Sequence, residues 1–207
     1  MSYLVHHLAL VGAYTLQHMA LVLVSLAIAL IIAVPLGIFA AHNRRIATPL
    51  LGALGVIYTI PSLALLAILV NYVGLGFWTA VIALVAYAQF LLVRNIATGL
   101  REVDPAQIDA ATGLGMSPRE RFWRVELPLA MPTVLGGIRI AAVTMISLAT
   151  IAAYINAGGL GVLIFSGLSQ AYPEKALAGS LPAAALAILA DLVLRSFERR
   201  ALKSSAS

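Results

Sequence analysis

The sequence predicts an all-α integral membrane protein with about five transmembrane helices and a short N-terminal interfacial helix. Hydrophobic residues make up 62% of the 207 residues and charged residues 10%, and the mean hydropathy is +1.01. These values lie outside the range of soluble globular domains. The apolar residues also gather in runs long enough to cross about 30 Å of hydrocarbon as helices, which takes roughly 20 residues each.

Five apolar runs are predicted to cross the membrane. Each consists mainly of Leu, Ile, Val, Ala and Gly. The second run contains Pro61 near its middle, where the missing N–H removes a backbone hydrogen bond and kinks the helix. The runs cover about residues 19–41, 48–73, 78–96, 129–155 and 176–197.

Residues 1–18 are predicted to form a separate short helix at the outer surface, followed by one transmembrane domain at 19–207. The segment contains His6, His7 and His18, so an interfacial helix fits it better than a sixth span. It also lacks the basic start and cleavage site of a secretory signal. The flanks of the histidines hold no acidic or thiol partner, and we expect these rings in the headgroup layer rather than on a metal.

Basic residues fix the predicted orientation, because they gather in three segments that separate alternate spans. Under the positive-inside rule these segments face the cytoplasm. The C-terminus and a coupling loop at about 97–128 then lie inside, whereas the N-terminus and about residues 71–77 and 156–172 lie outside. The basic residues are Arg44 and Arg45, then Arg94, Arg101, Arg119, Arg121 and Arg124, and finally Arg195, Arg199, Arg200 and Lys203.

The first half of the cytoplasmic loop predicts a short capped helix. Asp104 is a favourable N-cap, and Pro105 stands at the first helical position, where its missing amide proton costs nothing. The helix runs through Asp109. Gly113 and Gly115 tolerate left-handed backbone and are expected to end it.

The second half of the loop predicts another short helix. Ser117 and Glu120 have the spacing of a capping box, in which each side chain accepts from the other residue's amide. Phe122, Trp123 and Val125 follow as an apolar edge. Pro128 is expected to mark a turn into the fourth span.

Two polar, irregular segments are candidates for a translocation pathway. In the second span Pro61 frees a carbonyl at mid-membrane, and Thr59 and Ser62 are placed to compensate. This predicts either a broken helix that lines a path or a simple kinked span. The glycine-rich segment after the fourth span predicts either an outer gate or a flexible turn, and its residues are Asn156, Gly158 and Gly159.

Small residues and a few charges inside the spans predict close helix packing. Stripes of Ala and Gly allow helices to approach closely, either within the bundle or at a dimer seam. Arg139 is expected to reach the cytoplasmic surface or a neighbouring helix, and Asp191 to pair with Arg195 one turn away. The stripes are Ala29, Ala33, Gly37 and Ala41 in the first span and Gly137, Ala141, Ala149 and Ala153 in the fourth.

Several classes of function are excluded by what the sequence lacks. The chain has no cysteine and no Gly-Lys-Ser or Gly-Lys-Thr phosphate loop, so we expect neither a thiolate metal site nor ATP hydrolysis by the chain itself. No catalytic triad, carboxylate pair or metal-binding helix motif points to an enzyme. The basic residues do not form one face with stacking aromatics, which argues against nucleic acid. Aromatic residues make up 7% of the chain and look scattered.

At the cytoplasmic loop the chain resembles the membrane subunits of ATP-binding-cassette importers. Their signature is Glu-Ala-Ala, three residues, Gly, nine residues, Ile, any residue and Leu-Pro. This chain keeps every spacing and departs from the signature in an Asp for the Glu and a Val for the Ile. The matching residues are Asp109, Ala110, Ala111, Gly115, Val125, Leu127 and Pro128.

Further strings narrow the resemblance to the glycine betaine, carnitine and choline permeases of osmoprotectant uptake. Each string is short, but all occur in the family's order and extend over most of the chain. They are Thr59–Leu66, Arg94–Asn95, Val103–Pro105, Gly137–Arg139 and Ala157–Gly161.

The resemblance implies a type I importer permease that lines the pathway for betaine-like quaternary ammonium solutes. Its partners are two cytosolic ATPase subunits, which bind ATP and Mg²⁺, a second copy or a paralogue of the permease, and a separate extracytoplasmic substrate-binding protein. The chain itself binds no cofactor, and it spans the inner membrane of a prokaryotic cell several times, surrounded by lipid. Another small zwitterion or an amino acid is the alternative cargo. A secondary transporter or channel and a non-transporting scaffold are alternatives that need no capped cytosolic loop.

Overall fold

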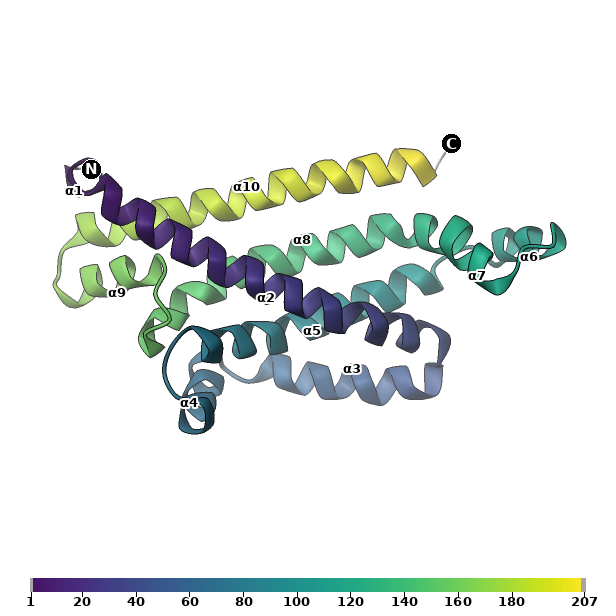
Figure 1. Cartoon of the computed structure of the whole chain (residues 1–207), viewed down its shortest axis with the longest axis horizontal. Helices are drawn as coiled ribbons and strands as arrows, with labels where there is room; N and C mark the ends of the chain where they lie inside the picture. Colours follow the sequence, from purple (N-terminus) through teal and green to yellow (C-terminus); the bar gives the residue numbers. More distant parts are fainter. Residues whose placement is uncertain (1, 206–207) are drawn as a thin grey trace.

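A computed structural model describes residues 2–205 of the chain, and this part is helical with no β-strand. The helices are connected by short turns, and the chain folds back on itself along one long axis (Figure 1). The elements are α1 (Ser2–His6), α2 (Leu8–His42), α3 (Arg44–Thr59), α4 (Ser62–Val73), α5 (Phe77–Arg101), α6 (Pro105–Gly113), α7 (Pro118–Arg121), the π-helix η1 (Phe122–Glu126), α8 (Leu127–Ile151), the 3-10 helix η2 (Ala152–Ile155), α9 (Gly161–Ser169) and α10 (Pro173–Ser205).

Four of the described helices are long and apolar enough to cross a membrane, and the bent pair α3 and α4 adds a fifth if it counts as one span. α5 packs against α2 and α8, and α8 packs in turn against α10. Figure 1 shows these helices lying roughly along the same direction. The predicted all-α membrane fold with about five spans is therefore confirmed.

The N-terminal boundary differs from the prediction. α2 begins at Leu8 and continues without a break through residues 18 and 19 to His42, because the sequence there contains no residue that stops a helix. His18 is fully buried, and its Nε2 lies 3.1 Å from the carbonyl oxygen of Ile146. His18 is thus a packed interhelical residue and does not lie in the headgroup layer.

The second predicted span is broken rather than kinked. α3 and α4 meet at an angle of 95°, and in Figure 1 α4 is seen nearly end-on where α3 runs along the long axis. Ile60 and Pro61 between them adopt extended backbone. Proline favours this outcome because it lacks the N–H and disfavours helical backbone in the residue before it.

The small-residue stripes pack inside the bundle. Ala29 and Ala33 are fully buried, and a Cβ added at Gly37 would lie 2.6 Å from the side chain of Ile96 on α5. In the same way, a Cβ at Gly137 would lie 2.3 Å from the Cβ of Asn95. The glycines therefore set the close approach of α5 to both α2 and α8, as expected in lipid.

In the C-terminal half the helix α9 was not predicted, whereas one of the two alternatives for Arg139, contact with a neighbouring helix, is confirmed. The outer segment expected as a loop at 156–172 contains the helix α9, which packs against α10 through Gly167 and Gly179. Arg139 forms ion pairs at 2.9 Å with Asp191 and at 3.0 Å with Glu198, both on α10. The expected pairing of Asp191 with its own neighbour one turn away is thus replaced by a link between α8 and α10.

Candidate functional site

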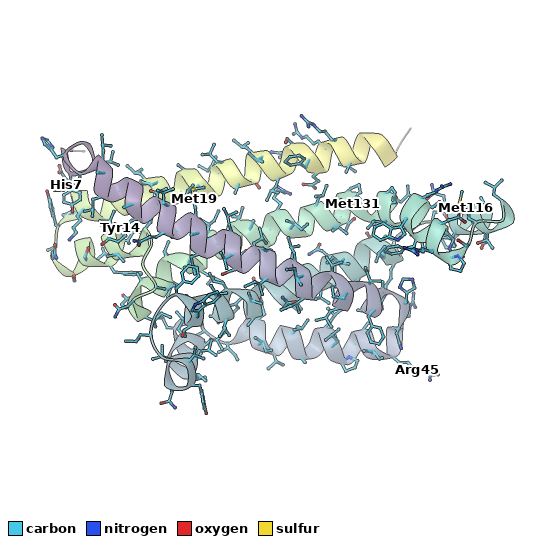
Figure 2. All side chains as sticks on the ribbon, viewed as in Figure 1. His7, Tyr14, Met19, Arg45, Met116 and Met131 are labelled. Carbon is cyan, nitrogen blue, oxygen red and sulfur yellow. The ribbon has the colours of Figure 1, made fainter. Side chains whose placement is uncertain are left out.

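The loop predicted to be cytoplasmic, at about residues 97–128, extends past one end of the bundle (Figure 1). Figure 1 shows α6 and α7 at the end away from α1 and the N-terminus. In Figure 2 the labelled Met116 of this loop and Arg45 lie toward one end, whereas His7 lies at the other. The segments predicted to share one side of the membrane therefore lie at one end of the molecule.

α6 is the first of the two helices predicted in the loop, and its N-cap is the predicted residue, Asp104. The Asp104 carboxylate accepts a hydrogen bond from the amide of Ala106 at 2.9 Å. At the far end, the amides of Gly115 and Met116 donate to the carbonyls of Thr112 and Ala111. Gly115 has φ +77°, a left-handed backbone that favours glycine. Gly113 is the last helical residue and does not have positive φ. Of the two glycines predicted to end the helix, only Gly115 therefore adopts the left-handed backbone that favours glycine.

The predicted capping box at Ser117 and Glu120 is present. The Ser117 hydroxyl accepts from the Glu120 amide at 3.3 Å, and Glu120 Oε2 accepts from the Ser117 amide at 3.0 Å. The Ser117 hydroxyl also donates to Glu120 Oε2 at 2.9 Å. The bonds that the carboxylate accepts, first from the Ser117 amide and then from the Ser117 hydroxyl, hold the pKa of the exposed Glu120 carboxyl below its ordinary value of 4.5.

The chain does not turn at Pro128, in contrast to the prediction. One helical segment runs from Pro118 through η1 and α8 to Ile155, 38 residues in all. Proline is tolerated near the start of α8 because η1 shifts the hydrogen bonding there, with the Leu127 amide donating to Phe122. The loop is consequently joined to the fourth span by continuous helix.

A buried carboxylate ties the two halves of the loop together. Glu126 is 7% exposed, and Arg121 Nε donates to its Oε1 at 2.9 Å. Arg121 Nη1 also donates to the Thr112 hydroxyl of α6 at 3.1 Å. His42 Nε2, at the end of α2, lies 4.0 Å from the other carboxylate oxygen. Arg121 was expected only as one of the basic residues that orient the chain, and no role was predicted for Glu126, although an acidic residue beside a membrane span was a usable signal.

The predicted coupling residues divide between a surface and its support. Asp109, Ala110, Gly115 and Pro128 are exposed, whereas Val125 and Leu127 are half-buried and Ala111 is buried. Leu114 adds an apolar side chain that is 79% exposed. The loop thus exposes a short helix whose surface carries small and apolar residues and the carboxylate of Asp109, whereas the inner face of the loop is packed against the bundle.

The helix break between α3 and α4 satisfies its own backbone. The Thr59 hydroxyl donates to the Val56 carbonyl at 2.7 Å, and the Ile60 amide donates to Ile57. The Ile60 carbonyl accepts from the hydroxyl of Tyr87 on α5. Of the two side chains predicted to compensate, Thr59 does so, whereas Ser62 makes no side-chain hydrogen bond within the described residues, and Tyr87 supplies a partner from another helix.

A cavity of about 240 Å³ lies beside this break. Three of its residues come from the break itself, one from α5 and two from α8, so it is a meeting point of three spans. Two of the aromatic residues, which looked scattered in the sequence, come together here, because the rings of Tyr58 and Tyr87 lie 6.1 Å apart. The lining residues are Tyr58, Ile60, Ser62, Tyr87, Thr144 and Leu148.

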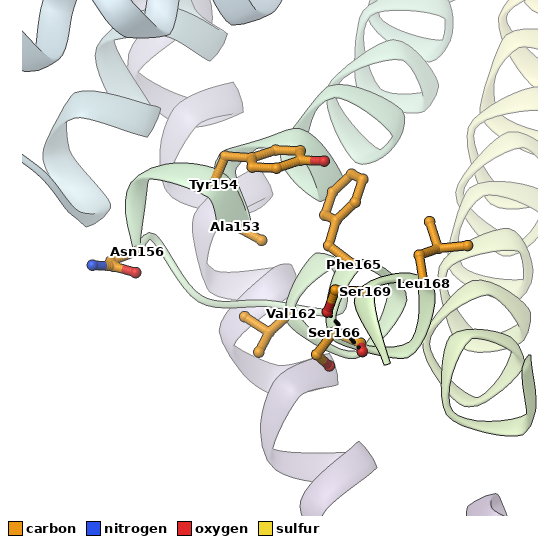
Figure 3. A pocket seen from close by; sticks show the side chains of 8 residues that line it. All are labelled: Ala153, Tyr154, Asn156, Val162, Phe165, Ser166, Leu168 and Ser169. Carbon is orange, nitrogen blue, oxygen red and sulfur yellow. Dashed lines mark hydrogen bonds between the residues drawn. The ribbon is translucent and has the colours of Figure 1, made fainter. Parts of the chain in front are cut away.

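The second predicted pathway segment lies elsewhere. Asn156 has φ 58° and lines an outer cavity of about 610 Å³ with Tyr154, Phe165 and Ser166 (Figure 3). Gly158 and Gly159 instead approach α2, and the amide of Gly159 donates to the side-chain oxygen of Gln17 at 3.2 Å. Ser62 and Asn156 line separate cavities.

Ion binding by acidic and histidine side chains has no support in the described chain. Within residues 2–205, no three His, Asp or Glu side chains come together in an arrangement that holds a metal ion.

Comparison with known proteins agrees with this architecture. Residues 33–203 match the family described as binding-protein-dependent transport system inner membrane component. The chain is 38% identical over 186 residues to the choline transport system permease protein OpuBB of Bacillus subtilis, covering 90% of this chain and 86% of that protein. It is 41% identical over 169 residues to the ergothioneine transport permease/ergothioneine binding protein EgtU of Helicobacter pylori, covering 82% of this chain and 31% of that protein.

The fold has a counterpart among solved structures. The inward-facing MetNI methionine ABC transporter aligns with a TM-score of 0.81 at 20% identity, covering 94% of this chain and 97% of the matched chain. The predicted type I importer permease fold is thereby confirmed. With the family match over most of the chain, the protein belongs to the inner membrane components of binding-protein-dependent transport systems.

Proposed function

We propose that the chain is the pathway-forming permease subunit of an ATP-driven importer for betaine-like quaternary ammonium solutes. The observation that carries the proposal is the continuous helix from Pro118 to Ile155. It begins in the exposed loop and reaches Thr144 and Leu148, which line the cavity at mid-span. A displacement of the loop therefore moves one wall of a cavity inside the membrane.

The coupling partners follow from the loop's surface. Two cytosolic ATPase subunits bind ATP and Mg²⁺, and a cleft in one of them receives α6 of this chain. Asp109 and Ala110 lie at the contact, and Gly115 shapes the end of the helix. Arg121 and Glu126 transmit the ATPase motion, since they join α6 to the base of α8. A second permease copy or a paralogue completes the pore.

The orientation follows from the charges. The loop, the α10 end and the arginines at 44 and 45 face the cytoplasm, and the N-terminus and α9 face outside. An extracytoplasmic binding protein delivers cargo to the outer end, where Asn156 lies. Support for quaternary ammonium cargo comes from relatives named for the transport of choline, of carnitine, and of glycine betaine, carnitine and choline together.

Co-purification with the ATPase subunits tests the docking. Asp109→Lys reverses the charge on the exposed face of α6 and is expected to reduce recovery of the ATPase at least tenfold. Glu102→Lys is the matched control, because it makes the same charge change at an exposed position before α6 and is expected to leave recovery unchanged. Equal recovery with Asp109→Lys and the unmodified chain would refute docking through α6.

Uptake by the reconstituted system tests the cargo and the energy source. Vesicles containing the permease and ATPase, supplied with the binding protein outside and ATP inside, are expected to accumulate labelled glycine betaine or choline. Accumulation without ATP would identify a channel or secondary carrier instead.

A second cargo is favoured by one observation. The relative named for ergothioneine transport is 41% identical, a value above the 38% of the choline permease. Ergothioneine uptake by the same vesicles, in the absence of choline and glycine betaine uptake, would assign the permease to this other cargo.

A further inference from the structure

The cavity at the helix break has two aromatic walls. Tyr58 ends α3 and Tyr87 lies in the middle of α5, with ring centroids 6.1 Å apart and ring planes at 77°. Both residues line the same cavity of about 240 Å³. Two nearly perpendicular rings form a corner in which a rounded group contacts both aromatic surfaces.

The two rings are held in place by contacts with neighbouring residues. Tyr87 is 5% exposed, and its hydroxyl donates to the Ile60 carbonyl freed by the broken helix. Tyr58 packs on Phe90 at 5.2 Å between centroids. The Arg94 guanidinium already lies over the Phe90 ring at 5.8 Å, so Tyr58 and Tyr87 are the rings left for another cation.

The remaining lining residues match a cation that carries methyl groups. Ile60 and Leu148 are apolar, Ser62 and Thr144 offer hydroxyls, and none of the six lining residues is acidic. A carboxylate would attract any cation, including Na⁺ and K⁺, whereas aromatic faces attract a cation of low hydration through the ring quadrupole. The volume is below the roughly 300–1,000 Å³ of pockets for drug-sized ligands, and it therefore suits a single headgroup.

We propose that Tyr58 and Tyr87 form a transient binding site for the quaternary ammonium headgroup of the cargo, inside the membrane and beside the broken second span. This inference rests on the proposed cargo class. The site binds weakly, because two rings supply about 0.5–2 kcal/mol each, and weak binding lets the solute leave. Ser62 and Thr144 hydrogen-bond the polar end of the solute.

The outer cavity is a poorer candidate for the same role. Its two rings, Tyr154 and Phe165, lie 4.3 Å apart and are tilted by 43°, and Figure 3 shows them next to each other. They pack on one another and leave no space for a cation between them. The cavity at the break also includes residues of α8, the helix that the coupling loop extends.

Direct binding to the purified permease–ATPase complex, without the binding protein, tests the site. The probes are labelled choline and its neutral carbon isostere 3,3-dimethylbutan-1-ol, which has the same shape but no charge. We expect choline to bind and the isostere to bind at least fivefold more weakly. Tyr58→Leu is expected to weaken choline binding about 2- to 30-fold and to remove the preference over the isostere, whereas Tyr58→Phe keeps both.

Two further variants keep the test decisive. Phe39→Leu makes a similar change at a position on α2 that is 52% exposed and lies outside the cavity, and it is expected to leave binding unchanged. If Tyr58→Leu fails to assemble, phenylalanines with increasing numbers of fluorines at position 58 retain the shape, and choline binding is expected to fall with each fluorine.

The outcomes separate this site from the proposed function. If vesicles with unmodified permease import neither choline nor glycine betaine, the cargo assignment fails. If they import choline but Tyr58→Leu and the fluorinated rings bind it as the unmodified chain does, the aromatic site is overturned and the cargo stands. Equal losses in Tyr58→Phe and Tyr58→Leu would also overturn it, because the hydroxyl and not the ring would then be responsible.

Discussion

The guanidinium of Arg121 lies 2.9 Å from the carboxylate of Glu126, five residues further along the same helix. A spacing of five matches the π-helical hydrogen bonding of η1, which brings the two side chains together where an α-helix would separate them. The same guanidinium reaches Thr112 on α6. One arginine therefore fixes the angle between the exposed coupling helix and the fourth span.

Removing this arginine is expected to loosen coupling without preventing assembly. Arg121→Met leaves Glu126 buried without its cation, and we expect a loss of about 1–3 kcal/mol in the stability of the loop, less than for a fully buried pair because the Arg121 side chain is 28% exposed. In reconstituted vesicles, ATP hydrolysis is expected to persist while the solute transported per ATP falls severalfold.

Arg119→Met is the control for this change, because Arg119 lies in the same short helix and is exposed. It removes the same charge and is expected to keep the transport-to-hydrolysis ratio of the unmodified chain. A ratio unaltered by Arg121→Met would show that α6 transmits force by another route.

The end of α6 depends on backbone conformation at a single glycine. A Cβ at Gly115 meets no atom within 4 Å, yet its φ is +77°, so Gly115→Ala costs about 1–2 kcal/mol through left-handed backbone alone. Gly115→Asn is expected to cost less, because Asn tolerates this conformation. Gly113→Ala has equal space and no positive φ, and should be neutral or slightly stabilising. Amide hydrogen exchange across residues 105–117 measures the local stability of α6 in the three variants and so ranks them.

The capping box is expected to weaken in acid. The pKa of Glu120 is lowered in the folded loop, so its contribution is fully present above the ordinary value of 4.5 and is lost as the pH falls through the lower folded value. Amide exchange at residues 117–121, corrected for its intrinsic pH dependence, should show protection lost below pH 4.5. Glu120→Gln retains a capping side chain and should remove this dependence; persistence of the acid effect in that variant would assign it to another group.

The loop was predictable from sequence because its signals are local. Asp104, Pro105, Ser117 and Glu120 cap their helices through neighbours at most three residues away, so spacing alone locates them. The positive φ of Gly115 follows from its place just after a helix. The seven coupling residues came from the resemblance, and their role in docking remains a prediction.

The features that were missed depend on contacts between distant segments. The Tyr58–Tyr87 corner needs the 95° break, and no local signal distinguishes such a break from a kink at Pro61. Pairing of Asp191 with Arg139 rather than Arg195 depends on how α10 lies against α8. α9 was missed because its nine residues are too few for a span. His18 was expected at the interface because its contact with the Ile146 carbonyl on α8 depends on tertiary packing.

Packing between α5 and α8 offers a final prediction with an internal control. A Cβ at Gly137 would lie 2.3 Å from the Asn95 Cβ. Only movement of the backbone can relieve this clash, so Gly137→Ala should destabilise the purified protein by about 1–3 kcal/mol. A Cβ at the adjacent Gly136 finds its nearest atom, Glu198 Oε1, at 3.4 Å, and Gly136→Ala should be neutral or stabilising. Asn95→Gly combined with Gly137→Ala removes the clash. Thermal unfolding in detergent should therefore show a positive coupling of at least 1 kcal/mol between the two sites, and additive effects would place the two helices further apart than the structure does.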